Sequence, residues 1–229
     1  MFEGKRILAL IPARGGSKRL PRKNVLSFSG KPLIAHTIDA CKKSKYVDRV
    51  IVTTDDAEVF EIANRFGAEV PFIRPTHLST DSATTNDVVM HALNMLSEKP
   101  DILLVLQPTS PLRDEYDIDS SIEMLFEKKA DGIVSVCKCE HSPLWTNVLP
   151  ADHSLRDFIK PASQLEAQKL KEYYRLNGAI YCFNVSFLSE NFGISYNGLV
   201  YAYIMGRNKS VDIDTIDDLE YAEFLLKNC

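Results

Sequence analysis

Short apolar runs rich in β-branched residues alternate with longer stretches of helical hydrophobic spacing through the first half of the chain. This order is typical of repeated β-α-β units. The expected strands are residues 7–11, 50–54, 70–73, 102–107 and 132–137. The expected helices are residues 31–43, 57–66, 84–96 and 118–127. Strands that are apolar throughout are buried on both faces, so we expect an α/β fold with a mostly parallel sheet between two layers of helices.

The second half of the chain is less regular. From residue 138 to about residue 172 the periodicity fails, and proline, histidine and charged residues become more frequent. The remaining regular elements are strands at residues 179–183 and 211–213 and an amphipathic helix at residues 217–226. We therefore expect a single domain over residues 1–229, with an insertion at residues 138–178 whose shape the sequence does not specify.

The composition is that of an ordinary globular protein, with 45% hydrophobic and 25% charged residues. The formal charge of −4 argues against general nucleic-acid binding, which needs a basic surface. The five cysteines are odd in number and scattered, so we expect reduced thiols. No apolar run approaches the ~20 residues that span a bilayer, and the first residues lack a secretory pattern. We expect a cytoplasmic protein that does not bind membranes.

A loop rich in glycine and cations follows the first expected strand, at the sheet edge where α/β proteins bind ligands. Gly15 and Gly16 allow a sharp turn whose N–H groups hold phosphate oxygens, and Ser17 adds a hydroxyl. The loop also carries five cations: Arg14, Lys18, Arg19, Arg22 and Lys23. This composition favours a polyanion such as a triphosphate, and the alternative is a solvated basic loop. The spacing matches neither a P-loop nor the G-x-G-x-x-G dinucleotide motif.

An acidic pair lies near the other end of the chain, where Val211 to Asp214 alternate apolar and acidic residues. In a strand, this alternation would direct Asp212 and Asp214 to one face. Mg²⁺ commonly uses one or two protein carboxylates and completes its coordination with water and substrate phosphates, so the pair is a candidate site for a nucleotide-bound metal. The alternatives are the acidic face of an edge strand, or a cap for the last helix together with Asp217 and Asp218.

Three further polar segments follow or open expected strands. Gln107 ends an apolar run at the same sheet edge as the glycine-rich loop. Arg74 follows the third strand and precedes Thr85, although Thr84 or Thr85 also suits the N-cap of the next helix. Residues 173–181 contain an arginine, an asparagine and aromatic residues that suit sugar hydroxyls or a carboxylate.

The combination of these segments resembles the acylneuraminate cytidylyltransferases, the CMP-sialic acid synthetases. The resemblance covers nearly the whole chain and rests on residues 11–24, 107–113, 140–145, 175–181 and 212–214, in this order. It implies a Rossmann-like, GT-A-like nucleotidyltransferase fold and a homodimer formed through the insertion. It also implies the reaction of CTP with a nine-carbon (nonulosonic) sugar acid, assisted by Mg²⁺, to give the CMP-sugar and pyrophosphate.

The resemblance also assigns roles to individual residues. It implies contacts with CTP by Arg14, Gly15, Gly16, Ser17, Lys23, Asn24, Arg74 and Thr85. It implies contacts with the sugar acid by Gln107, Arg175, Asn177 and Tyr181, and we expect Tyr196 to form one wall of the sugar pocket. Asp212 and Asp214 match the metal-binding carboxylates, and the expected catalytic set is Arg14, Lys23, Asp212 and Asp214.

One position departs from the family pattern. A family arginine that precedes glutamine and reaches the partner subunit's sugar carboxylate corresponds here to Ala167, before Gln168. Lys160, Lys169 and Arg156 are candidate replacements among which the sequence does not choose. The identity of the sugar therefore stays open between sialic, legionaminic and related acids.

The expected mechanism is an in-line attack of the sugar's anomeric hydroxyl on the α-phosphorus of CTP, with pyrophosphate as the leaving group and no covalent enzyme intermediate. Arg14 and Lys23 would offset the charge that grows on pyrophosphate. Two alternatives remain open: a cytidylyltransferase for 3-deoxy-octulosonic acid, and a nucleotide-binding protein of the same fold that has lost the reaction.

Overall fold

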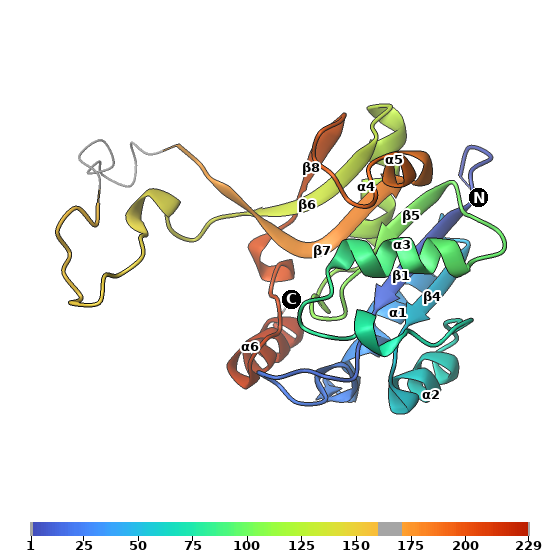
Figure 1. Ribbon diagram of the computed structural model, residues 1–229, viewed down its shortest axis with the longest axis horizontal. Coiled ribbons are helices and arrows are strands. Elements are labelled where there is room, and N and C mark those ends of the chain that lie inside the picture. The colour runs from blue at the N-terminus through green and yellow to red at the C-terminus, as the bar shows by residue number, and fades with distance from the viewer. Residues whose placement is uncertain (1, 160–170, 229) are drawn as a thin grey trace.

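A six-stranded sheet forms the centre of the protein in the computed structural model, which describes residues 2–159 and 171–228 (Figure 1). The strands are β1 (Ile7–Pro12), β4 (Arg49–Thr53), β5 (Ile102–Val105), β6 (Gly132–Lys138), β7 (Tyr174–Asn184) and β8 (Val200–Ile204). Their spatial order is β4-β1-β5-β7-β6-β8. Only β7 among these strands runs antiparallel to its neighbours. The predicted α/β fold with a mostly parallel sheet is confirmed.

The helices are α1 (Leu33–Lys43), α2 (Ala57–Arg65), α3 (Thr85–Met95), α4 (Glu115–Glu127), α5 (Val185–Glu190) and α6 (Ile216–Lys227). A hairpin of β2 (Ser27–Phe28) and β3 (Lys31–Pro32) precedes α1. Capping boxes at Thr84, Asp114 and Thr215 begin α3, α4 and α6, so α4 starts earlier than expected. Within the described part of the chain, every helix is too short or too polar to cross a membrane.

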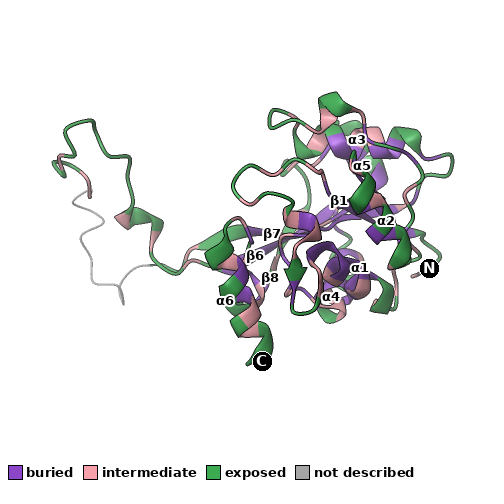
Figure 2. Cartoon of the chain, turned by 90° about the horizontal axis from the view of Figure 1, so that it is seen from below, coloured by how far each residue is buried: buried purple, intermediate pink, exposed green. Residues whose placement is uncertain are grey.

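Different helices cover the two faces of the sheet, as alternate residues of β1 show. Ile7, Ala9 and Ile11 belong to a core that includes side chains of α1, α2 and α4. Leu8 and Leu10 belong to a second core with side chains of α3 and α5. Successive side chains of a strand point to opposite faces, so each face has its own core. Both buried layers are visible in Figure 2.

A third, smaller core joins the two ends of the chain. It packs α6 against the β2–β3 hairpin and the start of α1, and it contains Phe28, Leu33, Ile213, Leu219 and Ala222. Ile213 is fully buried and lies between Asp212 and Asp214 in the sequence. Burial of this apolar side chain therefore anchors the acidic pair beside the segment that follows β1.

Two expected strands are wrong. Within residues 70–73, Ile73 forms one isolated bridge, with Thr54 just after β4, and Pro71 has no N–H to donate to a strand ladder. Residues 211–213 form an irregular connection before α6, in which the Ile213 N–H donates to the carbonyl oxygen of Thr109 at 2.8 Å. β8, α5 and the full length of β7 were not among the expected elements.

β6 and β7 leave the body as a two-stranded ribbon that carries an arm (Figure 1). The ribbon pairs Lys138 with Tyr174, and residues 139–159 follow as a largely exposed segment with one 3-10 turn, Pro143–Trp145. The predicted role of the insertion in dimer formation stays a prediction. Ala167, Gln168, Lys160 and Lys169 lie outside the described residues, so the replacement of the family arginine also stays open.

Candidate active site

The candidate residues gather at the sheet edge where β1, β4 and β5 end. Parallel strands present their carboxyl ends together at such an edge. β7 runs in the opposite direction, and its Tyr181 pairs with Val105 at the end of β5. The loop after β1, the segment after β5 and the first half of β7 therefore reach the same region.

The early cation loop and the late acidic pair are in direct contact. Lys23 begins the 3-10 turn η1 (Lys23–Val25), and its Nζ donates to Asp214 Oδ1 at 2.9 Å and to the carbonyl oxygen of Ile213 at 2.7 Å. Arg19 forms a second ion pair with Asp214, at 2.7 Å. Lys23 and Asp214, which are 191 positions apart in the sequence, therefore belong to one site.

Two other cations of the loop bind a carboxylate that the sequence analysis missed. Arg14 donates to Asp81 Oδ1 at 2.7 Å and to the carbonyl oxygen of Ser79 at 3.4 Å. Lys18 also pairs with Asp81. Hydrogen bonds from Lys18 and Arg14 hold the pKa of the Asp81 carboxyl below its usual value. The segment before α3 is thereby fastened to the loop after β1.

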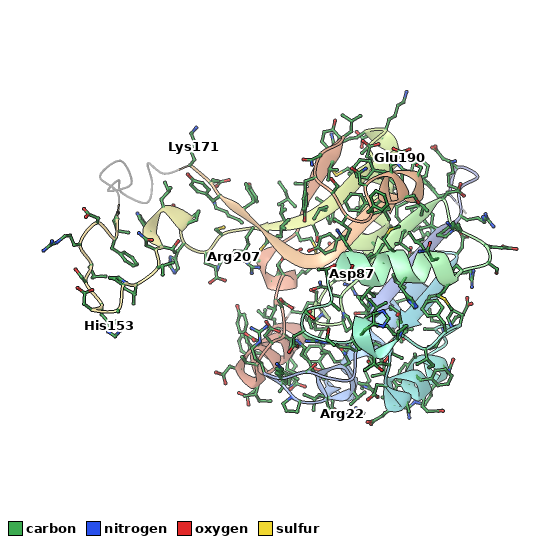
Figure 3. All side chains as sticks on the ribbon, viewed as in Figure 1. Arg22, Asp87, His153, Lys171, Glu190 and Arg207 are labelled. Atoms are coloured by element: carbon green, nitrogen blue, oxygen red, sulfur yellow. The ribbon has the colours of Figure 1, made fainter. Side chains whose placement is uncertain are left out.

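Gly15 and Arg22 fasten the same loop to the start of α2. The Gly15 N–H donates to Asp55 Oδ1 at 3.0 Å, and a Cβ on Gly15 would lie 2.5 Å from a carboxylate oxygen of Asp56. Arg22 pairs with Asp56 at the edge of the molecule (Figure 3). Neither Gly15 nor Gly16 has a positive φ, so close approach to α2, rather than backbone freedom, accounts for Gly15.

Five of the predicted residues line one pocket of about 180 Å³. Arg14, Ser17, Lys23 and Asn24 come from the loop after β1 and from η1, and Gln107 comes from the segment after β5. Asn24 is buried, and its Nδ2 donates to the carbonyl oxygen of Arg14 at 2.9 Å, which restrains the loop. Two cations and a hydroxyl border this space, and such groups suit phosphate oxygens.

A second pocket, of about 120 Å³, adjoins the first at Arg14. Arg74 and Thr85, both predicted to contact the nucleoside, line it. The buried Arg74 guanidinium donates to the carbonyl oxygen and hydroxyl of Thr53, and burial lowers its pKa to about 10, so it stays charged at neutral pH. Thr84 is the N-cap of α3, so capping accounts for Thr84 and not for Thr85.

Asp212 and Arg175 line a third and larger pocket, of about 470 Å³. Desolvation by neighbouring residues raises the pKa of the Asp212 carboxyl, a hydrogen bond from Thr109 opposes the rise, and the Asp214 carboxylate adds to it. Thr109 thus bonds both the Asp212 side chain and, through its carbonyl oxygen, the Ile213 backbone. The segment after β5 therefore supports the acidic pair directly.

The predicted sugar-binding residues have different environments. Tyr181 is half-buried, and burial raises the pKa of its phenol, with Tyr196 and Asp212 close enough to add to the rise. Tyr196 itself is exposed. Gly178 has a φ of 74°, and a Cβ there would lie 2.8 Å from Gln107 Oε1, so the β7 backbone touches the Gln107 amide.

Asn177 and Arg175 are both in β7 but differ in exposure. Asn177 is buried, and its amide is bonded within the chain. Arg175 is exposed, and its hydrogen bonds to the carbonyl oxygens of Leu176 and Ser210 are long, at 3.4 Å each. Direct contact of either residue with a sugar acid stays a prediction.

Several residues that shape the site were missed in the sequence analysis. Thr109 lies two residues after Gln107 in the same polar segment, so its position beside the site could have been inferred from the sequence. Asp55 directly follows the expected strand at residues 50–54, so its place at the sheet edge was a signal in the sequence, whereas Asp81 meets Arg14 and Lys18 only in the folded protein. Ser135 and Ser210 are single buried serines without any local pattern, and only the hydrogen bonds that they make identify them.

Comparison with known proteins agrees with the predicted resemblance. The chain matches the family described as Cytidylyltransferase over residues 8–225. It is 34% identical over 225 residues to the pseudaminic acid cytidylyltransferase of Campylobacter jejuni, with 96% of each chain covered. It is 35% identical over 234 residues to the CMP-N,N'-diacetyllegionaminic acid synthase of Legionella pneumophila, with 97% of each chain covered. It is 36% identical to the N-acylneuraminate cytidylyltransferase of Streptococcus agalactiae, covering 92% of this chain and 51% of that protein.

The fold is also that of a solved nucleotidyltransferase. CMP:2-keto-3-deoxy-manno-octonic acid synthetase, solved in complex with CTP, matches with a TM-score of 0.73 and 18% identity, covering 97% of this chain and 99% of that chain. At this identity the similarity concerns the fold alone, and it supports the predicted Rossmann-like architecture. Because the family match spans residues 8–225 and two relatives align along nearly their whole length, the chain belongs to the cytidylyltransferase family of nucleotidyltransferases.

Proposed function

We propose that this protein transfers CMP from CTP to a nine-carbon (nonulosonic) sugar acid and releases pyrophosphate. The contact between Lys23 and Asp214 carries the proposal, because it brings a cation-lined pocket and an acidic pair into one site. The names of the relatives refer to pseudaminic, legionaminic and N-acylneuraminic acids, which are all nonulosonic acids. This agreement supports the class of substrate and leaves the individual sugar to experiment.

The adjoining pockets suggest how the substrates would lie. The nucleoside would occupy the pocket beside Arg74, and the triphosphate would extend along Arg14 and Lys23. The sugar acid would bind near Gln107, with its anomeric oxygen in line with the α-phosphorus and the departing pyrophosphate oxygen. Arg14 and Lys23 are paired with carboxylates in the free protein, so phosphate oxygens would replace those carboxylates on binding. Both cations would then stabilise the charge that accumulates on pyrophosphate.

We further propose Asp212 and Asp214 as the residues that hold Mg²⁺. Carboxylate oxygens are suitable ligands for this hard cation, and Asp212 opens into the large pocket. Among residues 2–159 and 171–228, no group of three or more His, Cys, Asp or Glu residues is placed to hold a metal. A site with two carboxylates fits Mg²⁺, which takes its other ligands from water and phosphates. Bound there, Mg²⁺ would neutralise phosphate charge and make the sugar hydroxyl more acidic.

A panel of sugar acids tests the proposed function. The purified protein is incubated with CTP, Mg²⁺ and N-acetylneuraminic, legionaminic, pseudaminic or 3-deoxy-octulosonic acid, and pyrophosphate and CMP-sugar are measured. We expect turnover with at least one nonulosonic acid, and much less when UTP replaces CTP. Turnover with the octulosonic acid alone would favour the alternative enzyme. No turnover with any of them, together with CTP binding, would favour a nucleotide-binding protein without activity.

Gly178→Ala is expected to raise the KM for the sugar acid about tenfold or more, with a smaller effect on the KM for CTP. The reason is that a left-handed φ costs a non-glycine residue roughly 1–2 kcal/mol, and that the new Cβ would displace Gln107. Steady-state kinetics with each substrate varied in turn measures the change. Gly30→Ala is the control, because Gly30 also has a positive φ, of 86°, but a Cβ there meets no atom within 4 Å. Equal effects of the two variants would contradict the role of Gln107.

A further inference from the structure

A buried polar network joins β6, β7 and the segment that leads to Asp212. Ser135 of β6, Asn177 of β7 and Ser210 are each at most 2% exposed. Ser210 follows the 3-10 turn η6 (Arg207–Lys209), whose first residue is labelled below the root of the arm in Figure 3. Ser210 also lies two positions before Asp212 in the sequence. Contacts that hold Ser210 therefore restrain the carboxylate proposed for catalysis.

The Asn177 amide uses its whole hydrogen-bonding capacity inside the protein. Its Oδ1 accepts from Ser135 Oγ at 2.6 Å and from the Ala179 N–H at 3.2 Å. Its Nδ2 donates to Ser210 Oγ at 2.9 Å and to Met205 Sδ at 3.3 Å. An asparagine side chain has two N–H donors and one carbonyl oxygen with two lone pairs. These bonds therefore leave no donor or acceptor for a ligand.

The two serines extend the network into the backbone on either side. Ser135 Oγ accepts from the Ile180 N–H at 2.7 Å, in the part of the β6–β7 pair where the register shifts. Ser210 Oγ donates at 2.8 Å to the carbonyl oxygen of Gly206, at the start of the turn. Asn177 thus bonds Met205 before this turn and Ser210 after it. Through Asn177, both ends of the turn are tied to the part of the β6–β7 pair where the register shifts.

We propose that Asn177, Ser135 and Ser210 are positioning residues that hold the segment carrying Asp212, and that Asn177 does not touch the sugar acid. The inference rests on the proposed function, and it changes the role that the family resemblance implied for Asn177. Loss of one partner leaves a buried polar group unsatisfied and frees the turn, which displaces Asp212. Because Asp212 acts on the reacting groups, the defect falls on kcat rather than on the affinity for the sugar.

The variants Asn177→Ala, Ser210→Ala and the double variant test the proposal. We expect Ser210→Ala to lower kcat about tenfold, with the KM for the sugar acid changed by less than about twofold. In the Ser210→Ala background, Asn177→Ala should add less than about twofold to the loss, because both residues act through one contact. Ser121→Ala is the control, since Ser121 is a fully buried serine whose hydroxyl donates to the carbonyl oxygen of Ile118 within α4.

A direct role in sugar binding gives a different result. Asn177→Ala would then raise the KM for the sugar acid with kcat unchanged, and Ser210→Ala would resemble the wild-type protein; this outcome overturns the proposal. Amide hydrogen exchange gives a readout independent of turnover. We expect faster exchange over residues 205–214 in Asn177→Ala and in Ser210→Ala, and not in Ser121→Ala. If the wild-type protein turns over no sugar acid, the proposed function fails, and unchanged exchange in both variants would then refute the network by itself.

Discussion

Replacing Asp212 by asparagine is expected to lower kcat about a hundred- to a thousandfold while the protein stays folded. The amide has nearly the shape of the carboxylate but no charge, so it would neither bind Mg²⁺ well nor favour its approach to the phosphates. Asp212 opens into the large pocket, and Ile213 anchors its backbone in the core beside α6. The substitution therefore removes a charge at the site without changing the packing that holds it.

Initial rates of pyrophosphate release at saturating CTP, sugar acid and Mg²⁺ measure this effect. Asp217→Asn is the matched control, because it removes the same charge from an exposed position in the first turn of α6. The control is expected to retain nearly all activity. Turnover near the wild-type rate in Asp212→Asn at saturating Mg²⁺ would contradict the assignment of this carboxylate to catalysis.

That residues proposed to contact CTP and the sugar acid meet at one edge of the sheet was predictable from the sequence. Ser17, Lys23 and Gln107 each follow a strongly apolar strand, and the carboxyl ends of parallel strands meet at one edge. Their presence in one pocket depends only on this rule and on correct assignment of β1 and β5. The same rule does not predict the contact between Lys23 and Asp214, because this contact joins the two ends of the chain. The family resemblance placed Lys23 and Asp214 in one catalytic set, but neither it nor the periodicity of either segment predicted their direct contact.

The direction and partners of β7 were not predictable from local pattern. An apolar run such as residues 179–183 has the same appearance in a parallel or an antiparallel position, so the sequence does not reveal that β7 lies between β5 and β6. This placement nevertheless brings Tyr181 opposite Val105 and Gly178 against Gln107. The proposed sugar side of the site therefore depends on a strand whose direction and neighbours the sequence does not reveal.

The acidic pair shows that alternating side chains can differ in burial although the expected strand does not form. Residues 211–213 do not form the expected strand, yet Ile213 is buried and Asp212 opens into a pocket. An apolar side chain between two acidic ones can be buried without strand pairing when the backbone runs along a core. Here that core is formed with α6. The alternation agrees with the burial of Ile213, while strand pairing depended on neighbours that the pattern does not contain.

Replacing Lys23 by methionine is expected to lower kcat/KM for CTP about a hundred- to a thousandfold. Methionine has a similar length and is apolar, so it preserves much of the packing of a side chain that is only 12% exposed. The variant loses the bonds to Asp214 and to the Ile213 carbonyl oxygen, and the charge that would meet the triphosphate. Thermal unfolding of the variant measures the structural part of this loss, and steady-state kinetics with CTP varied measures the catalytic part.

Lys18→Met separates this effect from a general loss of positive charge. Lys18 belongs to the same loop, but its side chain is 84% exposed, and Asp81 would keep its bond to Arg14 in the variant. Salt-screened, exposed pairs contribute little, so we expect kcat/KM for CTP to change by less than about threefold. Equal losses in the two variants would mean that the loop attracts CTP only through its overall charge. A large loss confined to Lys23→Met would show that Lys23 makes a specific contact with CTP. We expect this result, because Lys23 lies between the cation-lined pocket and the acidic pair.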